Sequence, residues 1–141
     1  KWEDPGADPM PLNGFLSRND QSSMLIGLEP EKLPAAMRDR FGPTGPFDRY
    51  DLDRGSIGLR FARLWTGNAA GIGMRPNREW TPWDDTPIIG FCRKLGFRYL
   101  ALQEGGFAPF DPQLVRTPVL CAEAVLVVHE SRLNDLRPWL H

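Results

Sequence analysis

The sequence predicts an α+β fold: a single compact domain with a mostly antiparallel sheet of roughly four to five strands and about three short helices packed on one face of it. The chain has 141 residues, of which 41% are hydrophobic, so it can bury one core of ordinary size. Segments with strand-like and helix-like apolar spacing follow one another in mixed order, which is typical of this class. We expect residues 1–11 to form an extended, proline-rich lead-in and residues 12–141 to form the domain.

The first predicted elements are a strand and a helix. Residues 22–28 contain the run Met-Leu-Ile and predict a strand. Residues 29–41 predict a helix, because two prolines stand near its start, where no amide donor is needed, and apolar residues follow at helical spacing. A Gly-Pro pair ends this helix, and residues 42–56 predict a loop rich in turn formers.

The next segment predicts a β-hairpin. Within Ile57–Trp65, apolar residues alternate with small or polar ones, which favours a strand. Thr66–Ala69 predicts the turn, and Gly71–Met74 predicts the returning strand. We expect residues 75–85 to form an aromatic, proline-containing loop.

A helix and a strand are predicted after this loop. Asp85, followed closely by a proline, is a favourable cap for a helix that runs to residue 95 with an apolar face. Gly96 then stops the helix, and Phe97–Gln103 predicts a strand. A turn at residues 104–106 and an irregular stretch at residues 107–112 complete this part.

The last part of the chain predicts a buried strand and a short helix. Residues 117–128 hold the strongest apolar run, whose β-branched end favours a strand ending near His129, although a helix is the alternative. Ser131 is the expected cap of the final helix, and Pro138 is expected to interrupt it.

The charge and the cysteines limit the partners. Seventeen basic and eighteen acidic residues give a net charge of −1, which argues against nucleic acid because phosphate binding needs clustered Lys and Arg. No apolar run is long enough to span a membrane, so no membrane partner is expected. Cys92 and Cys121 lie in apolar stretches as expected buried thiols, and no zinc spacing occurs, so no metal or other cofactor is predicted. The cytoplasm is favoured, while a secreted form or a piece of a larger protein stays open.

A glycine-rich segment is a candidate anion site. Gly67, Asn68, Gly71 and Gly73 lie close together, and the backbone amides of such a turn can hold a phosphate. The spacing distantly resembles the pyrophosphate loop of acyl-CoA-dependent acetyltransferases, although Asn68 stands where that family has Gln or Arg. The resemblance implies a small transferase that depends on acyl-CoA or a nucleotide. A tight hairpin turn is the alternative.

Three aspartates, Asp48, Asp51 and Asp53, alternate with arginines in the predicted 42–56 loop. A calcium loop of the EF-hand type needs a further acid and a terminal Glu, and the segment lacks both. We expect either a solvated loop whose charges neutralise one another or an edge that presents acids to a basic partner.

The most distinctive segment holds two tryptophans beside acids. Trp80 and Trp83 flank a Thr-Pro pair, with Arg78 before them and Asp84 and Asp85 after them. Aromatic anchors ringed by Arg and Asp are typical of protein-recognition hot spots. The alternatives are a lid folded over the sheet and a platform that stacks on a sugar ring.

These patterns favour a non-catalytic recognition domain that binds another protein, as an inhibitor or immunity-type protein does. The chain has no Gly-x-Ser-x-Gly motif, and the spacing gives no support for pairing Cys92 or Cys121 with His129. A small transferase that uses the Gly67–Gly73 segment is the alternative function. A carbohydrate-binding module that uses the two tryptophans is a further alternative.

Overall fold

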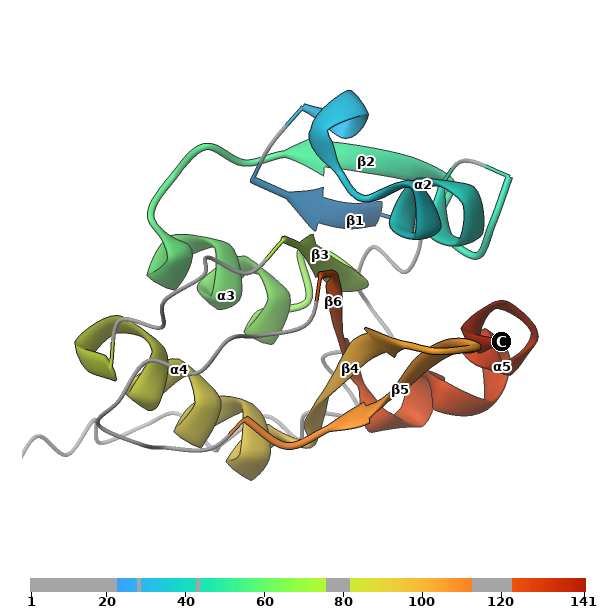
Figure 1. Cartoon of the computed structure of the whole chain (residues 1–141). Helices are drawn as coiled ribbons and strands as arrows, with labels where there is room; N and C mark the ends of the chain where they lie inside the picture. The colour runs from blue at the N-terminus through green and yellow to red at the C-terminus, as the bar shows by residue number, and fades with distance from the viewer. Residues whose placement is uncertain (1–22, 28, 43, 76–81, 113–122) are drawn as a thin grey trace, which may run out of the picture.

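The apolar segments of the described residues form one mixed sheet of six strands, with four α-helices packed on it (Figure 1). The computed structural model describes residues 23–27, 29–42, 44–75, 82–112 and 123–141. The strands are β1 (Ser23–Ile26), β2 (Arg49–Leu52), β3 (Gly71–Met74), β4 (Phe97–Gln103), β5 (Gly106–Phe110) and β6 (Val125–His129). The helices are α2 (Ala35–Phe41), α3 (Ile57–Trp65), α4 (Pro82–Leu95) and α5 (Leu133–Leu140), with 3-10 turns η1 (Pro30–Lys32) and η2 (Glu130–Arg132). The predicted α+β single domain is confirmed.

The sheet joins a parallel half to an antiparallel half. Its strand order is β2-β1-β3-β6-β4-β5. Strand β1 pairs in parallel with β2 and with β3, whereas β6 runs antiparallel to β3 and β4, and β5 runs antiparallel to β4. The carboxyl ends of β2, β1 and β3 therefore lie along one edge of the sheet, the position where open sheets of parallel strands commonly bind ligands.

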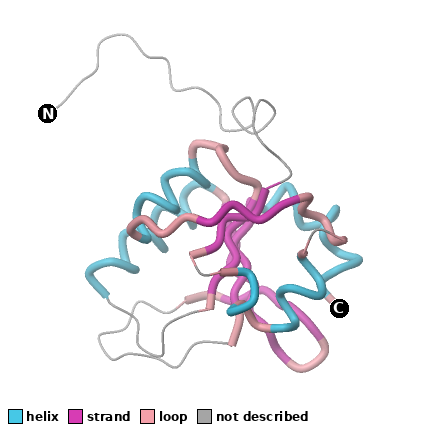
Figure 2. The backbone as a smooth tube through the Cα atoms, turned by 90° about the horizontal axis from the view of Figure 1, so that it is seen from above, coloured by secondary structure: helices cyan, strands magenta, loops and turns pink. Residues whose placement is uncertain are grey.

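Helices cover both faces of the sheet, as Figure 2 shows. Helices α3 and α4 pack on one face, in a cluster with Leu25 and Phe61, while α2 and α5 pack on the other, in a cluster with Met24 and Phe41. The expectation of helices on one face only is wrong. Every residue of β1 and β6 is buried, and strands buried on both faces need cover from both sides.

Residues Ile57–Trp65 are helix α3, so the predicted strand is wrong. Ser56 precedes the helix, and its Oγ accepts a hydrogen bond from the backbone N of Leu59 at 3.4 Å. Phe61 and Leu64 are buried while Leu59 is exposed. The core-facing residues thus repeat with the helical period, which competes with the two-residue alternation in the same short segment.

Helix α3 ends in a Schellman motif. The backbone N of Asn68 donates to the carbonyl of Arg63 at 2.8 Å, and that of Gly67 donates to the carbonyl of Leu64 at 3.0 Å, the two bonds that define this motif. Gly67 has a φ of 74°, which glycine adopts without strain. The predicted hairpin is therefore wrong, because β3 pairs with β1 and β6 and not with residues 57–65.

Two segments predicted as irregular contain the edge strands. Strand β2 lies inside the 42–56 segment, and β5 covers most of residues 107–112. Strands β4 and β5 form a hairpin whose turn places Gly106 at a φ of 147°. A Cβ at Gly106 would overlap the carbonyl oxygen of Leu140, so the hairpin and the end of α5 pack at a distance that only glycine allows.

Other elements follow the prediction with shifted boundaries. The first strand, the helix after it and Phe97–Gln103 are confirmed. Helix α4 begins at Pro82, inside the segment predicted as a loop and three residues before the predicted start, so Pro87 lies within the helix. The predicted strand at 117–128 is confirmed in its last part by β6, while residues 113–122, like the predicted lead-in at 1–11, lie outside the described residues.

The C-terminal cap differs from the expected one. The ring of His129 accepts a hydrogen bond from the backbone N of Ser131 and so caps the η2 turn. Helix α5 follows directly and continues through Pro138, which does not interrupt it. The expectation that Ser131 caps this helix is therefore wrong, because α5 has Arg132 at its N-cap and no side-chain cap bond.

The Ser56 cap gives a test of the helical assignment of α3. We expect Ser56→Ala to lower the free energy of unfolding by about 1 kcal/mol, because the backbone N of Leu59 loses its acceptor. Ser56→Asp, which keeps an acceptor, is expected to retain most of the stability. Chemical denaturation followed by circular dichroism measures both, and equal stability of Ser56→Ala and the unchanged protein would contradict the cap.

Candidate functional site

The tryptophan-rich segment is only partly described. Arg78 and Trp80 lie outside the described residues, and Trp83 and Asp84 lie in the first turn of α4 with side chains that are also outside the description. Asp85 is half-buried on α4. Burial raises the pKa of Tyr99, with further contributions from Cys92 and from the negative charge of Asp85. Asp85 is thus close enough to the core face of the helix to affect this phenol.

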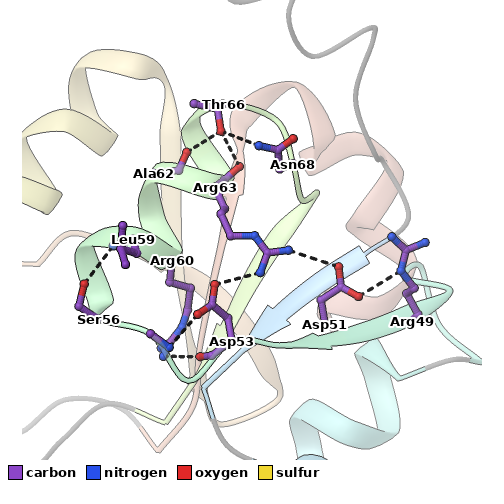
Figure 3. Close-up of polar contacts among 11 residues, drawn as sticks. Arg49, Asp51, Asp53, Ser56, Leu59, Arg60, Ala62, Arg63, Thr66 and Asn68 are labelled. Carbon is purple, nitrogen blue, oxygen red and sulfur yellow. Dashed lines mark hydrogen bonds and ion pairs between the residues drawn. The ribbon is translucent and has the colours of Figure 1, made fainter.

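Two of the three predicted aspartates join a network of ion pairs between β2 and α3 (Figure 3). Arg49 Nε lies 3.1 Å from Asp51 Oδ1, and Arg63 lies 3.7 Å from Asp51 Oδ2 and 2.9 Å from Asp53 Oδ2. Asp48 is exposed just before β2. The segment predicted as a solvated loop is therefore an edge strand, and Arg63 on the neighbouring helix balances its acids.

Asp53 is the most strongly held of these acids. Its Oδ1 accepts from the backbone N of Gly55 at 2.8 Å, and its Oδ2 accepts from Arg63 at 2.9 Å. The hydrogen bond from Arg63, followed by that from Gly55, holds the pKa of the Asp53 carboxyl below its usual range. Asp53 therefore fixes the turn that leads from β2 into α3.

Arg60 lies at the carboxyl end of β1. Its Nη2 donates to the backbone oxygen of Asp53 at 2.9 Å, and its guanidinium fills the space where a side chain at Gly27 would stand. The Nε atom is buried and has no hydrogen-bond partner among the described residues. Burial lowers the pKa of this guanidinium, which stays charged at neutral pH because an arginine pKa starts so high. A buried unpaired donor costs free energy, so Arg60 is a candidate functional residue.

The sequence alone did not single out Arg60 or Arg63, because it placed them on a strand. A usable signal was present in the spacing. Ser56, Arg60 and Arg63 recur at intervals of four and three residues, which on a helix brings all three to one side. That side faces the end of β2, as Figure 3 shows.

The predicted anion segment is explained by packing in the structure. Gly67 is part of the end of α3, and Asn68 donates from Nδ2 to Thr66 Oγ1 at 3.1 Å. Gly71 and Gly73 are buried inside β3. The side chains that a Cβ at these two positions would meet are Phe47 and Val128 at Gly71, and Met24 and Met37 at Gly73. These two glycines lie on the same face of β3 and let side chains of the core cluster under α2 and α5 approach the strand closely.

The described cysteine is a buried thiol, as predicted. Trp65 Nε1 donates to Cys92 Sγ at 3.4 Å, and Tyr99 Oη donates to it at 3.8 Å. Burial raises the pKa of Cys92, which keeps it protonated. Phe91, next to Cys92 on α4, is exposed and packs against Trp65 with ring centroids 5.3 Å apart. Cys121 lies outside the described residues.

Neither a cluster of metal ligands nor a membrane-spanning helix occurs among the described residues. Within the described ranges, no three His, Cys, Asp or Glu side chains gather as metal ligands. Among the helices described, none has the length and apolar character needed to cross a membrane.

Comparison with known proteins shows a remote likeness. No protein-family model matches the chain, and no curated protein matches it. A solved structure described as "Crystal structure of 2'AMP bound SaIMPase-II" aligns with a TM-score of 0.47 and 14% sequence identity. The alignment covers 86% of this chain and 42% of that one, so this chain spans less than half the length of that protein. At this level the likeness supports no conclusion about function.

The charge network predicts a pH-dependent contribution from Asp53. We expect Asp53→Asn to lower the free energy of unfolding at pH 7 by about 1–3 kcal/mol, because hydrogen bonds to a charged carboxylate are lost. A carboxyl with a lowered folded pKa stabilises the fold above its unfolded pKa, and this stability is lost as the pH falls through the folded pKa. The difference between the two proteins should therefore shrink as the pH falls below about 4.

Asp51→Asn is the matched control, because the Asp51 pairs are longer and more exposed. It should cost no more than about 1 kcal/mol. Denaturation at several pH values measures both variants. An effect of Asp53→Asn that is constant with pH would contradict the role given to its charge.

Proposed function

We propose that this domain is a non-catalytic recognition module that binds an extended segment of another protein along the edge strand β2. The observation that carries the proposal is the position of β2, which pairs with β1 on one side and is one of the two outermost strands among those described. An edge strand offers unpaired backbone donors and acceptors to an added strand.

The hydrogen-bond pattern indicates which groups point outward. The backbone N of Asp53 donates to Ile26 of β1 at 2.8 Å. Because alternate residues of a parallel strand bond to the same neighbour, the backbone groups of Asp51 also face β1. The backbone groups of Tyr50 and Leu52 then face away from β1, toward the position of an added strand.

The side chains of β2 suit recognition on both faces. Leu52 is 44% exposed on one face and supplies apolar contact. On the other face, Arg49 and Asp51 form an exposed ion pair that can exchange partners with charged groups of a ligand. Asp48 adds an exposed acid beside them, which suits a basic side chain on the partner. The acidic segment suggested that such binding inhibits the partner protein, as binding by an immunity protein does.

The test separates binding through the backbone of β2 from binding through any exposed apolar side chain. Leu52→Pro removes an N–H that β1 does not use, so it is expected to fold and to lose the partner. Leu59→Ser is the control, because Leu59 is 63% exposed but lies on α3. The partner is first captured from the native host and then purified, and its affinity for each variant is measured. We expect Leu52→Pro to bind at least about tenfold more weakly than the unchanged protein and Leu59→Ser to bind almost as tightly.

The outcome that contradicts the proposal is equal recovery of every captured protein by both variants. A dimer of this chain in analytical ultracentrifugation that Leu52→Pro dissolves would also contradict it, because β2 would then pair with a second copy. Circular dichroism confirms that each variant is folded.

A second candidate function rests on Arg60. Within the described part of the chain its buried Nε has no partner, and the guanidinium lies at the carboxyl ends of β1 and β2, where parallel strands commonly bind ligands. An anionic small molecule such as a nucleotide, the ligand class of the transferase alternative, would satisfy such a cation.

Thermal melting with AMP, ATP and coenzyme A tests this candidate. A ligand at one hundred times its dissociation constant should stabilise the fold by about 2.7 kcal/mol. Arg60→Gln is expected to abolish the rise in melting temperature, while Arg54→Gln, which removes an exposed arginine paired with Glu29, keeps it. The candidate is rejected if none of the three compounds raises the melting temperature, or if Arg60→Gln responds like the unchanged protein.

A further inference from the structure

A serine and a histidine are in hydrogen-bond contact just after β6. His129 Nδ1 lies 2.8 Å from Ser131 Oγ. The same Nδ1 accepts from the backbone N of Ser131 at 3.3 Å, so it carries no proton. The Ser131 hydroxyl therefore donates its proton to Nδ1, which is the arrangement of a nucleophile and its general base.

The imidazole ring is held in this tautomer by its surroundings. The other ring nitrogen, Nε2, lies beside Gly96. Phe97 packs edge-on against the ring with centroids 5.2 Å apart. Because Nδ1 accepts from the backbone N of Ser131, the proton of the neutral ring is on Nε2.

Access differs between the two side chains. His129 is 7% exposed, whereas Ser131 is exposed. Burial lowers the pKa of His129, so the ring is neutral and able to accept a proton at pH 7. The charged groups that face it are Glu130, which favours the protonated ring, and Arg98, which opposes it, and these two form an ion pair at 2.6 Å.

We propose that Ser131 is a nucleophile, activated by His129, that accepts an acyl group from an activated ester. The Ser131 Oγ forms a bond to the acyl carbon, and the bond from that carbon to the leaving oxygen breaks. The Oγ proton passes to His129 Nδ1, and the leaving group departs as its oxyanion. The imidazolium then releases the proton to water. This site lies on β6 and η2 and is independent of the β2 edge.

Ser56 supplies a matched control within the same chain. Like Ser131 it is an exposed serine in a capping contact, but its Oγ accepts a hydrogen bond from the backbone N of Leu59 and the contact includes no imidazole. A purely structural role of the His129–Ser131 contact predicts equal reactivity of the two serines. Activation by a general base predicts that Ser131 reacts ~100-fold faster.

The experiment treats the full chain with p-nitrophenyl acetate and maps acetylation by peptide mass spectrometry. We expect acetylation at Ser131, loss of the fast phase in Ser131→Ala, and an unchanged fast phase in Ser56→Ala. The rate should fall with decreasing pH only below the ordinary titration range of histidine, because burial lowers the pKa of His129 and only the protonated ring cannot accept the Oγ proton. His129→Gln should slow the reaction ~100-fold if it folds, and the pH profile of the unchanged protein carries the same information if it does not.

Equal acetylation of Ser131 and Ser56 overturns the proposal. A Ser131 rate that does not fall on acidification at any pH at which the protein stays folded overturns it as well, because the His129–Ser131 contact would then be structural only.

Discussion

The structure depends on the burial of β1, β3 and β6 on both of their faces. Every residue of β1 and β6 is buried, so each strand needs a layer of side chains on each face of the sheet. The helices of both layers follow from this requirement. The glycines of β3 make room on one of these faces, since Phe47 and Met24, both in the core under α2 and α5, lie where their side chains would stand.

The sequence predicted an element correctly where its local residue pattern agreed with its tertiary environment. Phe97–Gln103 was predicted with the bounds that it has, because a glycine stop precedes it and Gly105 follows it. Ile57–Trp65 was ambiguous, since its apolar residues fit a period of two and a period of three to four at once. The residues at its two ends indicate a helix, because Ser56 is a helix cap and Gly67 is a helix stop.

The charged edge of the sheet was beyond local reasoning. Arg-Tyr-Asp-Leu has little strand character, and only pairing with β1 makes it a strand. The acids within it were recognised as candidates, but their partner Arg63 lies on an element that had been assigned wrongly. The helical spacing could have placed Arg60 beside Arg63, but the burial of its Nε without a partner among the described residues is a property of packing that the sequence does not show. The predicted tryptophan surface stays a prediction, since Trp80 lies outside the described residues.

The central position of β6 has a consequence for biosynthesis. This strand joins β3 to β4, so without it the described sheet would consist of two separate pieces, β2-β1-β3 and β4-β5. Its residues leave the ribosome after those of every other strand described. A nascent chain therefore holds two incomplete sheets, each with one unprotected side, until translation of this region is nearly complete. Pairing of β6 with β3 then brings together residues as distant in the sequence as Gly71 and Val128 in a single late event. A chaperone that covers the unpaired edges of the two incomplete sheets until then would raise the yield of native protein.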